Sequence, residues 1–125
     1  MGRAVRFFAN PALAAGLVAA VLVGCGSITF PERTPTVLGE IVGIGDGTPL
    51  GGATTIWVKE DPDEACGIVF QTDKTFIGDR LDSGLIRQRD FDQLALGQRV
   101  RVWAGAIAES CPAQGSAGAI EIVSE

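Results

Sequence analysis

The sequence predicts an all-β domain that closes into a small barrel, and two observations predict it. After Val37 the apolar residues recur with a period near two, which is typical of half-buried strands, and a helical stripe is almost absent. Gly39 and Gly43 lie inside the first apolar stretch, where glycine marks the sharp bends of a barrel. Five short strands with one long connection favour an OB-like barrel, and a small antiparallel β-sandwich is the alternative.

Each predicted strand is bounded by turn residues. The five strands are expected at Val37–Ile44, Thr54–Lys59, Gly67–Thr72, Gln98–Ala104 and Ala119–Val123. The connection from Asp73 to Leu96 contains no clear strand beyond a short extension at 75–77. Asp90 is predicted to cap one helical turn that ends before Gly97. The small residues at 113–118 predict a loop.

The N-terminus reads as an export signal. Arg3 and Arg6 precede an apolar run from Ala12 to Val23, which is shorter than the roughly 20 residues of a membrane-spanning helix. The run ends in Leu22-Val23-Gly24-Cys25, which resembles the lipobox of bacterial lipoproteins. That resemblance implies a signal peptide at 1–24 and a lipid joined to Cys25. An ordinary cleaved signal and an uncleaved N-terminal helix are the alternatives.

The rest of the chain divides into a tether and one domain. Residues 25–36 contain glycine, serine, threonine and two prolines, and predict a flexible tether. Residues 37–125 form the predicted barrel domain. The expected location is extracytoplasmic, with the lipid anchor holding the chain to a membrane. That membrane is the outer one, on its periplasmic side, in a cell with two membranes, and otherwise the outer face of the plasma membrane.

Composition excludes several classes of function. The chain has 10 basic and 15 acidic residues; without Arg3 and Arg6 the balance is 8 against 15, or −7, which disfavours nucleic acid. The sequence contains no histidine, the commonest general base and metal ligand. Ser110 beside Glu109 is therefore interpreted as a turn residue. The acids at 61–64 are interpreted as a solvated turn. No catalytic residue, metal or cofactor is predicted.

Three cysteines remain to be assigned. With Cys25 lipidated, Cys66 and Cys111 form an even pair in an exported protein, which predicts a structural disulfide. Such a bridge stabilises a domain of this size by about 4 kcal/mol on the chain-entropy estimate. A redox-active pair is the alternative, although the Cys-x-x-Cys spacing is missing.

One strand face is a candidate binding surface. Trp103 shares a face of its strand with Arg99 and Arg101, opposite the apolar face of Val100 and Val102. Outward aromatic and arginine side chains are typical of ligand or partner contacts. The hypothesis is a non-enzymatic module that binds a small molecule, a glycan or an envelope protein there. The alternatives are that the tryptophans only cover the barrel, and that the domain is purely structural.

The stretch from Phe91 to Gln114 carries a family resemblance. Its pattern joins Phe91, Leu94 and Gly97 to the Val-x-Val-Trp motif and then to Glu-Ser-x-Pro-x-Gln at 109–114. It resembles the C-terminal half of the YobA-like domain of unknown function, found in small secreted bacterial lipoproteins. The resemblance supports the fold and the location. Where that family more often has an aromatic residue, this chain has Cys111, which implies that a disulfide replaces an aromatic plug.

Overall fold

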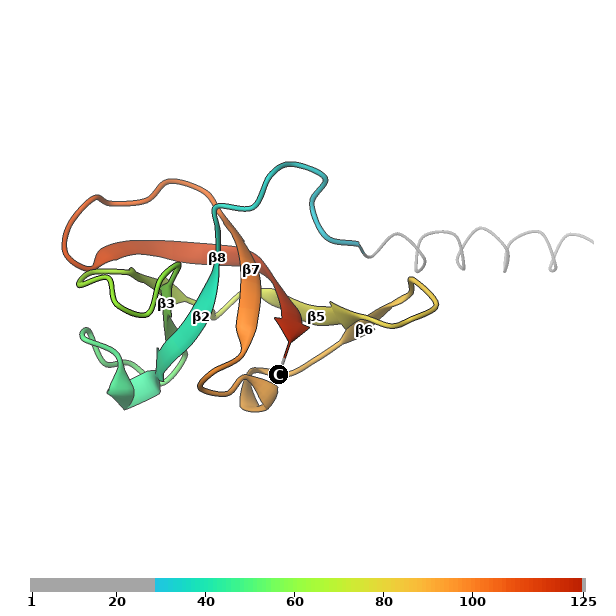
Figure 1. Cartoon of the computed structure of the whole chain (residues 1–125), viewed down its shortest axis with the longest axis horizontal. Coiled ribbons are helices and arrows are strands. Elements are labelled where there is room, and N and C mark those ends of the chain that lie inside the picture. The colour runs from blue at the N-terminus through green and yellow to red at the C-terminus, as the bar shows by residue number, and fades with distance from the viewer. Residues whose placement is uncertain (1–28, 125) are drawn as a thin grey trace, which may run out of the picture.

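The computed structural model describes residues 29–124, and they are almost entirely β-structure (Figure 1). The strands are β2 (Val37–Ile44), β3 (Thr55–Lys59), β4 (Ile68–Gln71), β5 (Phe76–Arg80), β6 (Ile86–Gln88), β7 (Arg99–Ala104) and β8 (Ala113–Ser124). Two single 3₁₀ turns, η1 (Gly45–Gly47) and η2 (Phe91–Gln93), precede β3 and β7. The predicted signal at 1–24 and the lipidation site Cys25 lie outside the described residues. Within 29–124 no helix has the length and apolarity to cross a membrane.

Five strands close into a mixed barrel, which confirms the predicted fold class. Neighbouring strands follow the order β4-β3-β2-β7-β8, and a parallel pairing of β4 with β8 closes the ring. All other pairings within the ring are antiparallel. This is one closed sheet with the connectivity of an OB-type barrel, so the sandwich alternative is wrong.

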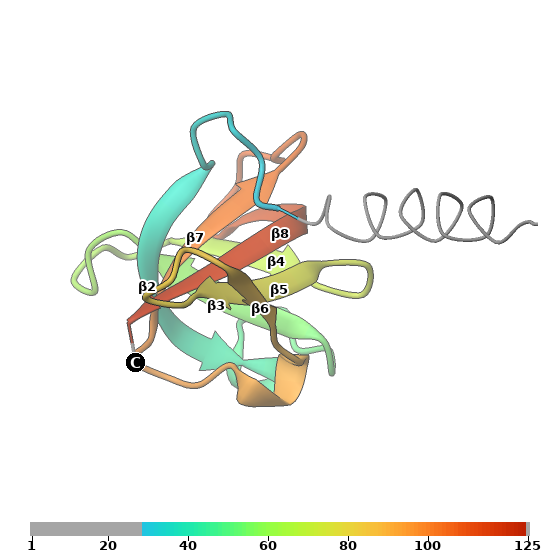
Figure 2. The same ribbon diagram turned by 90° about the vertical axis from the view of Figure 1, so that its right-hand side faces the viewer.

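The long strand β8 belongs to the barrel and to an extension of it. Its first part, from Ala113 to Ser116, pairs with β4, and its second part, from Ala119 to Ile122, pairs with β5. The β5–β6 hairpin therefore continues the sheet beyond the barrel, and it projects from one end of the molecule in Figure 1. Figure 2 shows β4 and β5 on the same side of β8.

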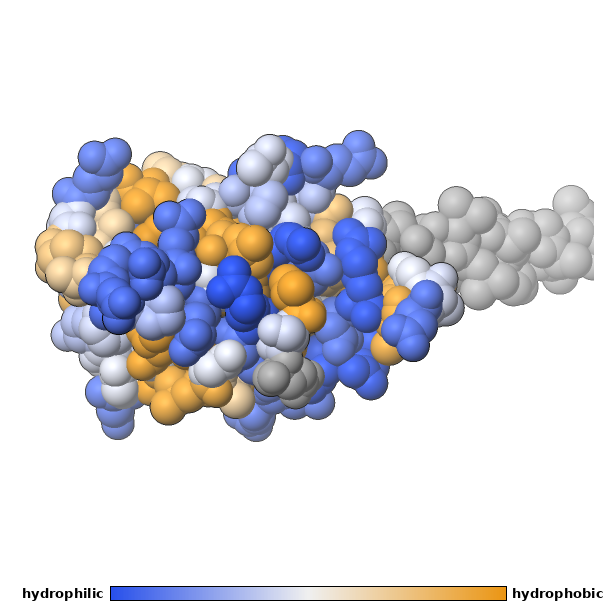
Figure 3. Space-filling model, in the orientation of Figure 1, coloured by the Kyte–Doolittle hydropathy of each residue, from blue (hydrophilic) through white to orange (hydrophobic). Residues whose placement is uncertain are grey.

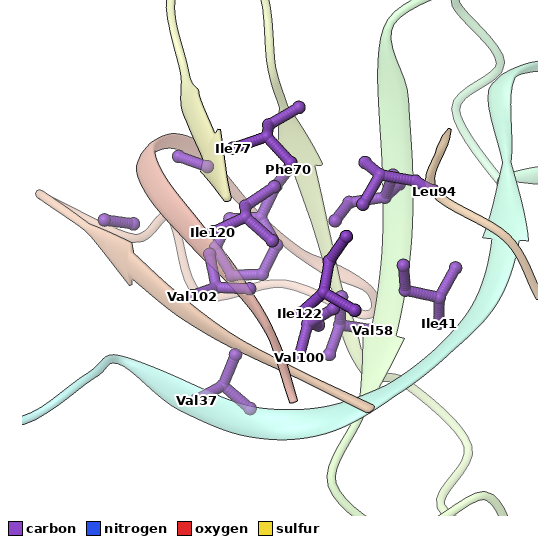
Figure 4. Packing of buried hydrophobic residues seen from close by; sticks show 13 residues of the cluster. Val37, Ile41, Val58, Phe70, Ile77, Leu94, Val100, Val102, Ile120 and Ile122 are labelled. Carbon is purple, nitrogen blue, oxygen red and sulfur yellow. The ribbon is translucent and has the colours of Figure 1, made fainter. Parts of the chain in front are cut away.

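Apolar side chains fill the barrel interior. Alternate residues of the barrel strands point inward and are joined by Ile77 of β5 and by Leu94, which follows η2; Figure 4 labels ten of these side chains, and most are completely buried. Those labelled are Val37, Ile41, Val58, Phe70, Ile77, Leu94, Val100, Val102, Ile120 and Ile122. The barrel interior is thus a packed core, and ligands must bind outside it.

Three local predictions can be compared with the structure. The helical turn opened by Asp90 is confirmed as η2, where the Gln93 side chain accepts the Asp90 amide at 2.8 Å. The loop expected at 113–118 is wrong, because those small residues belong to β8. A Cβ on Gly115 would lie 2.5 Å from the side chain of Ile107, so small residues there let the preceding loop pack on the strand. Of the β5–β6 hairpin, only the short extension at 75–77 was predicted, and it overlaps the start of β5.

Candidate functional site

The predicted binding face on β7 is covered by the N-terminal segment. The ring of Phe30 stacks on Trp103 at 5.5 Å between centroids, with 14° between their planes. The indole Nε1 of Trp103 donates to the Arg33 carbonyl at 2.8 Å, and only 4 % of the residue is exposed. The expectation of an outward, accessible Trp103 is therefore wrong. The ring does lie on the outer face of the barrel, but another part of the chain covers it.

Residues 30–36 dock on the barrel, which corrects this part of the predicted flexible tether. Phe30 is 2 % exposed, in a small cluster with Trp103 and Ala119. At the other end of the segment, the Thr36 amide donates to the Val102 carbonyl at 2.7 Å. The Thr36 hydroxyl oxygen also accepts the amide of Ala104 at 2.9 Å. The segment is thus held by apolar contact at one end and by hydrogen bonds at the other.

The two predicted arginines are on this face but have different surroundings. Arg99 is exposed at the start of β7. Arg101 pairs with Glu121 at 3.2 Å, and the second oxygen of the same carboxylate accepts from Arg80 at 3.1 Å. The Glu121 side chain is only 6 % exposed, and the two guanidinium groups compensate for the burial of its charge. The structure therefore does not bring Arg99, Arg101 and Trp103 together as an open surface.

A second ion-pair network joins the strands of the hairpin. Asp79 accepts hydrogen bonds from Arg87 at 3.1 and 2.7 Å and from Arg89 at 2.7 Å. The Arg87 hydrogen bond is the largest influence that lowers the pKa of Asp79 below 3.8, and burial opposes it. The charges of Arg87 and Arg89 lower this pKa further. The network is structural, since it ties β5 to β6 and to the residue that follows β6.

The disulfide lies on the opposite side of the barrel, beside the other tryptophan. Cys66 and Cys111 are bonded, with their Cα atoms 4.9 Å apart, and they link the start of β4 to the loop before β8. Trp57 Nε1 donates to the Cys66 carbonyl at 2.8 Å. The Lys59 ammonium lies 4.5 Å from the centre of the Trp57 ring, which is half-buried.

An acidic hollow of about 320 Å³ opens beside the disulfide. Its lining includes Val58 and Ile68 as well as the carboxylates of Glu60, Glu64 and Glu109. Glu64 accepts the backbone amide of Glu60 at 2.7 Å, so this carboxylate organises the turn that bears it. Among residues 29–124 no three acidic or cysteine side chains are grouped to hold a metal ion. The hollow disfavours anions and offers no metal-binding geometry.

A groove runs along the outer side of the β4–β8 pair. The parallel register sets Val69 beside Gln114 and Gln71 beside Ser116. Two adjoining hollows, of about 210 and 270 Å³, share Gln71 and Ser116, and Leu50 borders the first. Asp73 and Lys74, with opposite charges, border the second hollow. We call this surface the β4–β8 groove and define it by Leu50, Val69, Gln71, Asp73, Lys74, Gln114, Gly115 and Ser116.

The polar side chains of the β4–β8 groove are available to a ligand. Gln71, Gln114 and Ser116 are exposed, and within residues 29–124 their side chains have no hydrogen-bond partner. Val69 is 1 % exposed and forms an apolar floor between them. Amide and hydroxyl groups around an apolar floor are the usual composition of a small-molecule site.

The fold and this surface define the class of protein: a small OB-type barrel with a polar groove, without net charge, on its outer face. The chain belongs to the family described as protein of unknown function (DUF3221), which matches residues 52–124. The match covers β3 to β8, which are four of the five barrel strands and the β5–β6 hairpin. Comparison with curated proteins found no match, and comparison with solved structures found none either.

The β4–β8 groove was missed by sequence reasoning. The sequence predicts Gln71 within a strand, and Gln114 and Ser116 within a small-residue loop. A signal was nevertheless present, since the polar residues Gln114 and Ser116 are two positions apart, the spacing of residues on one face of a strand. What the sequence could not show is that this strand lies parallel to β4.

Proposed function

We propose that this chain is an extracytoplasmic lipoprotein whose barrel is a non-enzymatic binding module, and that the β4–β8 groove takes an uncharged glycan. The observation that carries the proposal is the row of unpaired polar side chains along the groove, Gln71, Gln114 and Ser116. Glutamine amides both donate and accept hydrogen bonds, which matches the hydroxyl groups of a sugar.

The shape of the groove favours an elongated ligand. Each hollow is smaller than the roughly 300 Å³ of a typical ligand pocket, so a ligand of ordinary size must lie across both. Gln71 and Ser116, which the two hollows share, would then contact its middle. Val69 pairs in the sheet with Trp57, whose half-buried ring lies on the same outer face. An aromatic ring next to polar groups supports a sugar rather than a charged ligand.

The location rests on the sequence. Leu22-Val23-Gly24-Cys25 ends a short apolar run, and the C-terminal half resembles the YobA-like domain of secreted lipoproteins. Lipid on Cys25 would hold the barrel at a membrane. More than one acyl chain is required for stable anchoring.

The chemistry of the described residues supports binding without catalysis. The sequence has no histidine to activate a nucleophile. The hydroxyl of Ser110 donates to the Pro112 carbonyl at 2.7 Å, as a turn residue does. A purely structural role in the envelope is the second candidate, and it is favoured by the completely filled barrel interior.

A glycan-binding experiment tests the proposal. The lipidated full chain, in detergent, is titrated with a panel of neutral and amino-sugar oligosaccharides. We expect the double variant Gln71→Ala/Gln114→Ala to bind at least about tenfold more weakly, since each lost hydrogen bond costs about 1 kcal/mol. Gln88→Ala, at an exposed glutamine on β6, is the matched control and should bind normally. If the native chain binds no sugar of the panel, the structural role is favoured instead.

Mass spectrometry tests the anchor separately. The chain expressed with its own N-terminus in a bacterial host should begin at Cys25 and carry the mass of acyl groups. In the Cys25→Ser variant these groups should be absent and the protein should leave the membrane fraction. An unmodified Cys25 in the native chain contradicts the lipoprotein assignment.

A further inference from the structure

The N-terminal segment is fixed to the sheet close to the predicted lipid. Phe30 contacts β5 and β7 through Phe76, with ring centres 5.6 Å apart, and Trp103, at 5.5 Å. The Arg80 guanidinium lies 5.3 Å from the centre of the Phe30 ring. Cys25 precedes Phe30 by five residues, which span at most about 18 Å when extended. A lipid on Cys25 therefore keeps this side of the barrel near the membrane.

The β5–β6 hairpin projects at the same end of the molecule. Figure 1 shows the tip of the hairpin and the start of the described chain toward one end, with the loop between η1 and β3 toward the other. The turn at the tip is well formed, because the Leu81 amide donates to the Leu85 carbonyl and the Gly84 amide to the Leu81 carbonyl, both at 2.8 Å. We call residues 80–87 the hairpin tip.

Two apolar side chains of the hairpin tip are exposed to solvent. Leu85 is 68 % exposed and Leu81 is 40 % exposed. In Figure 3 hydrophobic residues lie beside strongly hydrophilic ones at this end. Exposed leucines at the end of a projecting hairpin are apolar area that an apolar environment can bury.

Arginines surround these leucines. Arg80 and Arg87 are the first and last residues of the hairpin tip. Both are ion-paired, yet 51 and 53 % of their side chains are exposed. Asp82 is the one acid within the hairpin tip. All six arginines that follow Cys25 lie on the N-terminal segment, on β5 to β7 or in the connection at 89: Arg33, Arg80, Arg87, Arg89, Arg99 and Arg101. The stretch from β5 to β7 also carries four acids, Asp79, Asp82, Asp90 and Asp92.

The far side of the barrel is strongly acidic. The loop between β3 and β4 carries Glu60, Asp61, Asp63 and Glu64, and Glu109 lies on the same hollow. An anionic surface repels this acidic side, whereas the hairpin tip, with two arginines and one acid, is not repelled. Charge and the anchoring point thus select the same orientation.

We propose that the hairpin tip is a membrane-binding surface, with Leu81 and Leu85 inserted among the headgroups of an anionic phospholipid bilayer. Arg80 and Arg87 then contact lipid phosphates beside them. The inference rests on the lipidation of Cys25 proposed above. The anchor confines the barrel to the surface, so a contact too weak to bind alone is sufficient.

Spin labels test the orientation. Leu85→Cys, and as a control Leu50→Cys in the loop between η1 and β3, are labelled with a nitroxide in the lipidated full chain. Each chain is reconstituted in vesicles of phosphatidylethanolamine and phosphatidylglycerol. We expect reconstitution to lower the rate of collisions between the nitroxide and a water-soluble nickel complex several-fold at position 85. At position 50 the collision rate should be the same before and after reconstitution. In vesicles of phosphatidylcholine alone the fall should be smaller.

The outcomes separate this inference from the proposed function. Equal access at both positions, with Cys25 shown to be acylated by mass spectrometry, would overturn the inference and leave the lipoprotein assignment intact. An unmodified Cys25 would overturn both. Hydrogen exchange of the unlabelled chain is a second measurement of the same orientation, and a label that perturbs the turn cannot affect it. Residues 80–87 should be protected by phosphatidylglycerol vesicles and residues 49–54 should not, and the reverse would also overturn the inference.

Discussion

The two tryptophans occupy comparable positions on the outer surface of the barrel but differ in how far they are buried. Each lies on a barrel strand and points away from the core, and each indole donates to a backbone carbonyl at 2.8 Å. Trp103 is buried under Phe30, whereas Trp57 stays half-exposed beside the disulfide and Lys59. The difference comes from chain outside the sheet: the N-terminal segment crosses one face and leaves the other open.

The consequence is that the two faces differ in what they can bind. The Trp103 face is stabilised by stacked rings and by ion pairs to Glu121. On the Trp57 side, the β4–β8 groove keeps polar groups that no part of the described chain satisfies. The first face is therefore structural and the second is open to a ligand. Four changes, taken from the largest expected effect to the smallest, test this contrast.

Removal of the disulfide should have the largest effect, and it acts on the Trp57 side. The double variant Cys66→Ser/Cys111→Ser frees a loop of 45 residues in sequence separation. We expect the free energy of unfolding to fall by about 4 kcal/mol, because the unfolded chain gains loop entropy. Urea denaturation measures it. Reducing agent should lower the unfolding free energy of the native protein and leave that of the variant unchanged. An equal effect on both proteins would contradict a stabilising bridge.

Phe30→Ala should uncover the Trp103 face. Truncation of this buried ring removes its contacts with Trp103 and Phe76, and we expect a loss of about 3 kcal/mol in unfolding free energy. In a Trp57→Phe background, the emission of Trp103 should shift to longer wavelength and become quenchable by iodide. An unchanged spectrum would show that residues 30–36 do not hold the ring in solution.

Asp79→Asn tests the hairpin network. Because its pKa is lowered by the hydrogen bond and charge of Arg87 and by Arg89, ionised Asp79 stabilises the fold above its ordinary pKa of 3.8. This stability is lost as the pH falls through the lowered pKa. The variant should be about 2 kcal/mol less stable at neutral pH and should lose less on acidification. Parallel pH profiles of variant and native protein would contradict this assignment.

Trp57→Phe should have the smallest effect. The substitution keeps an aromatic ring but removes the hydrogen bond to the Cys66 carbonyl and weakens the contact with Lys59. We expect a loss of about 1 kcal/mol in urea denaturation, since the ring is partly solvated. A loss as large as that of Phe30→Ala would remove the contrast between the two faces.

Much of the barrel was predictable because each inward strand face repeats with the period of a strand. Val100 and Val102 on β7, and Ile120 and Ile122 on β8, were predicted as core and are buried. The disulfide between Cys66 and Cys111 was predicted by counting the cysteines, on the expectation that the chain is exported. The β5–β6 hairpin was not predictable in this way, since Asp79, Arg80 and Arg87 break the apolar pattern and are compensated only by ion pairs across strands.

The sequence by itself determined most of the barrel strands, the fold class and the cysteine pairing, because periodicity and composition are local properties of the chain. Tertiary structure alone decided which outer face is covered. The distance between Phe30 and Trp103 in sequence gives no sign that their rings stack, and Gln71 and Ser116 become neighbours only through the parallel pairing of β4 with β8. The surface left open to a ligand is thus the one that long-range packing does not satisfy.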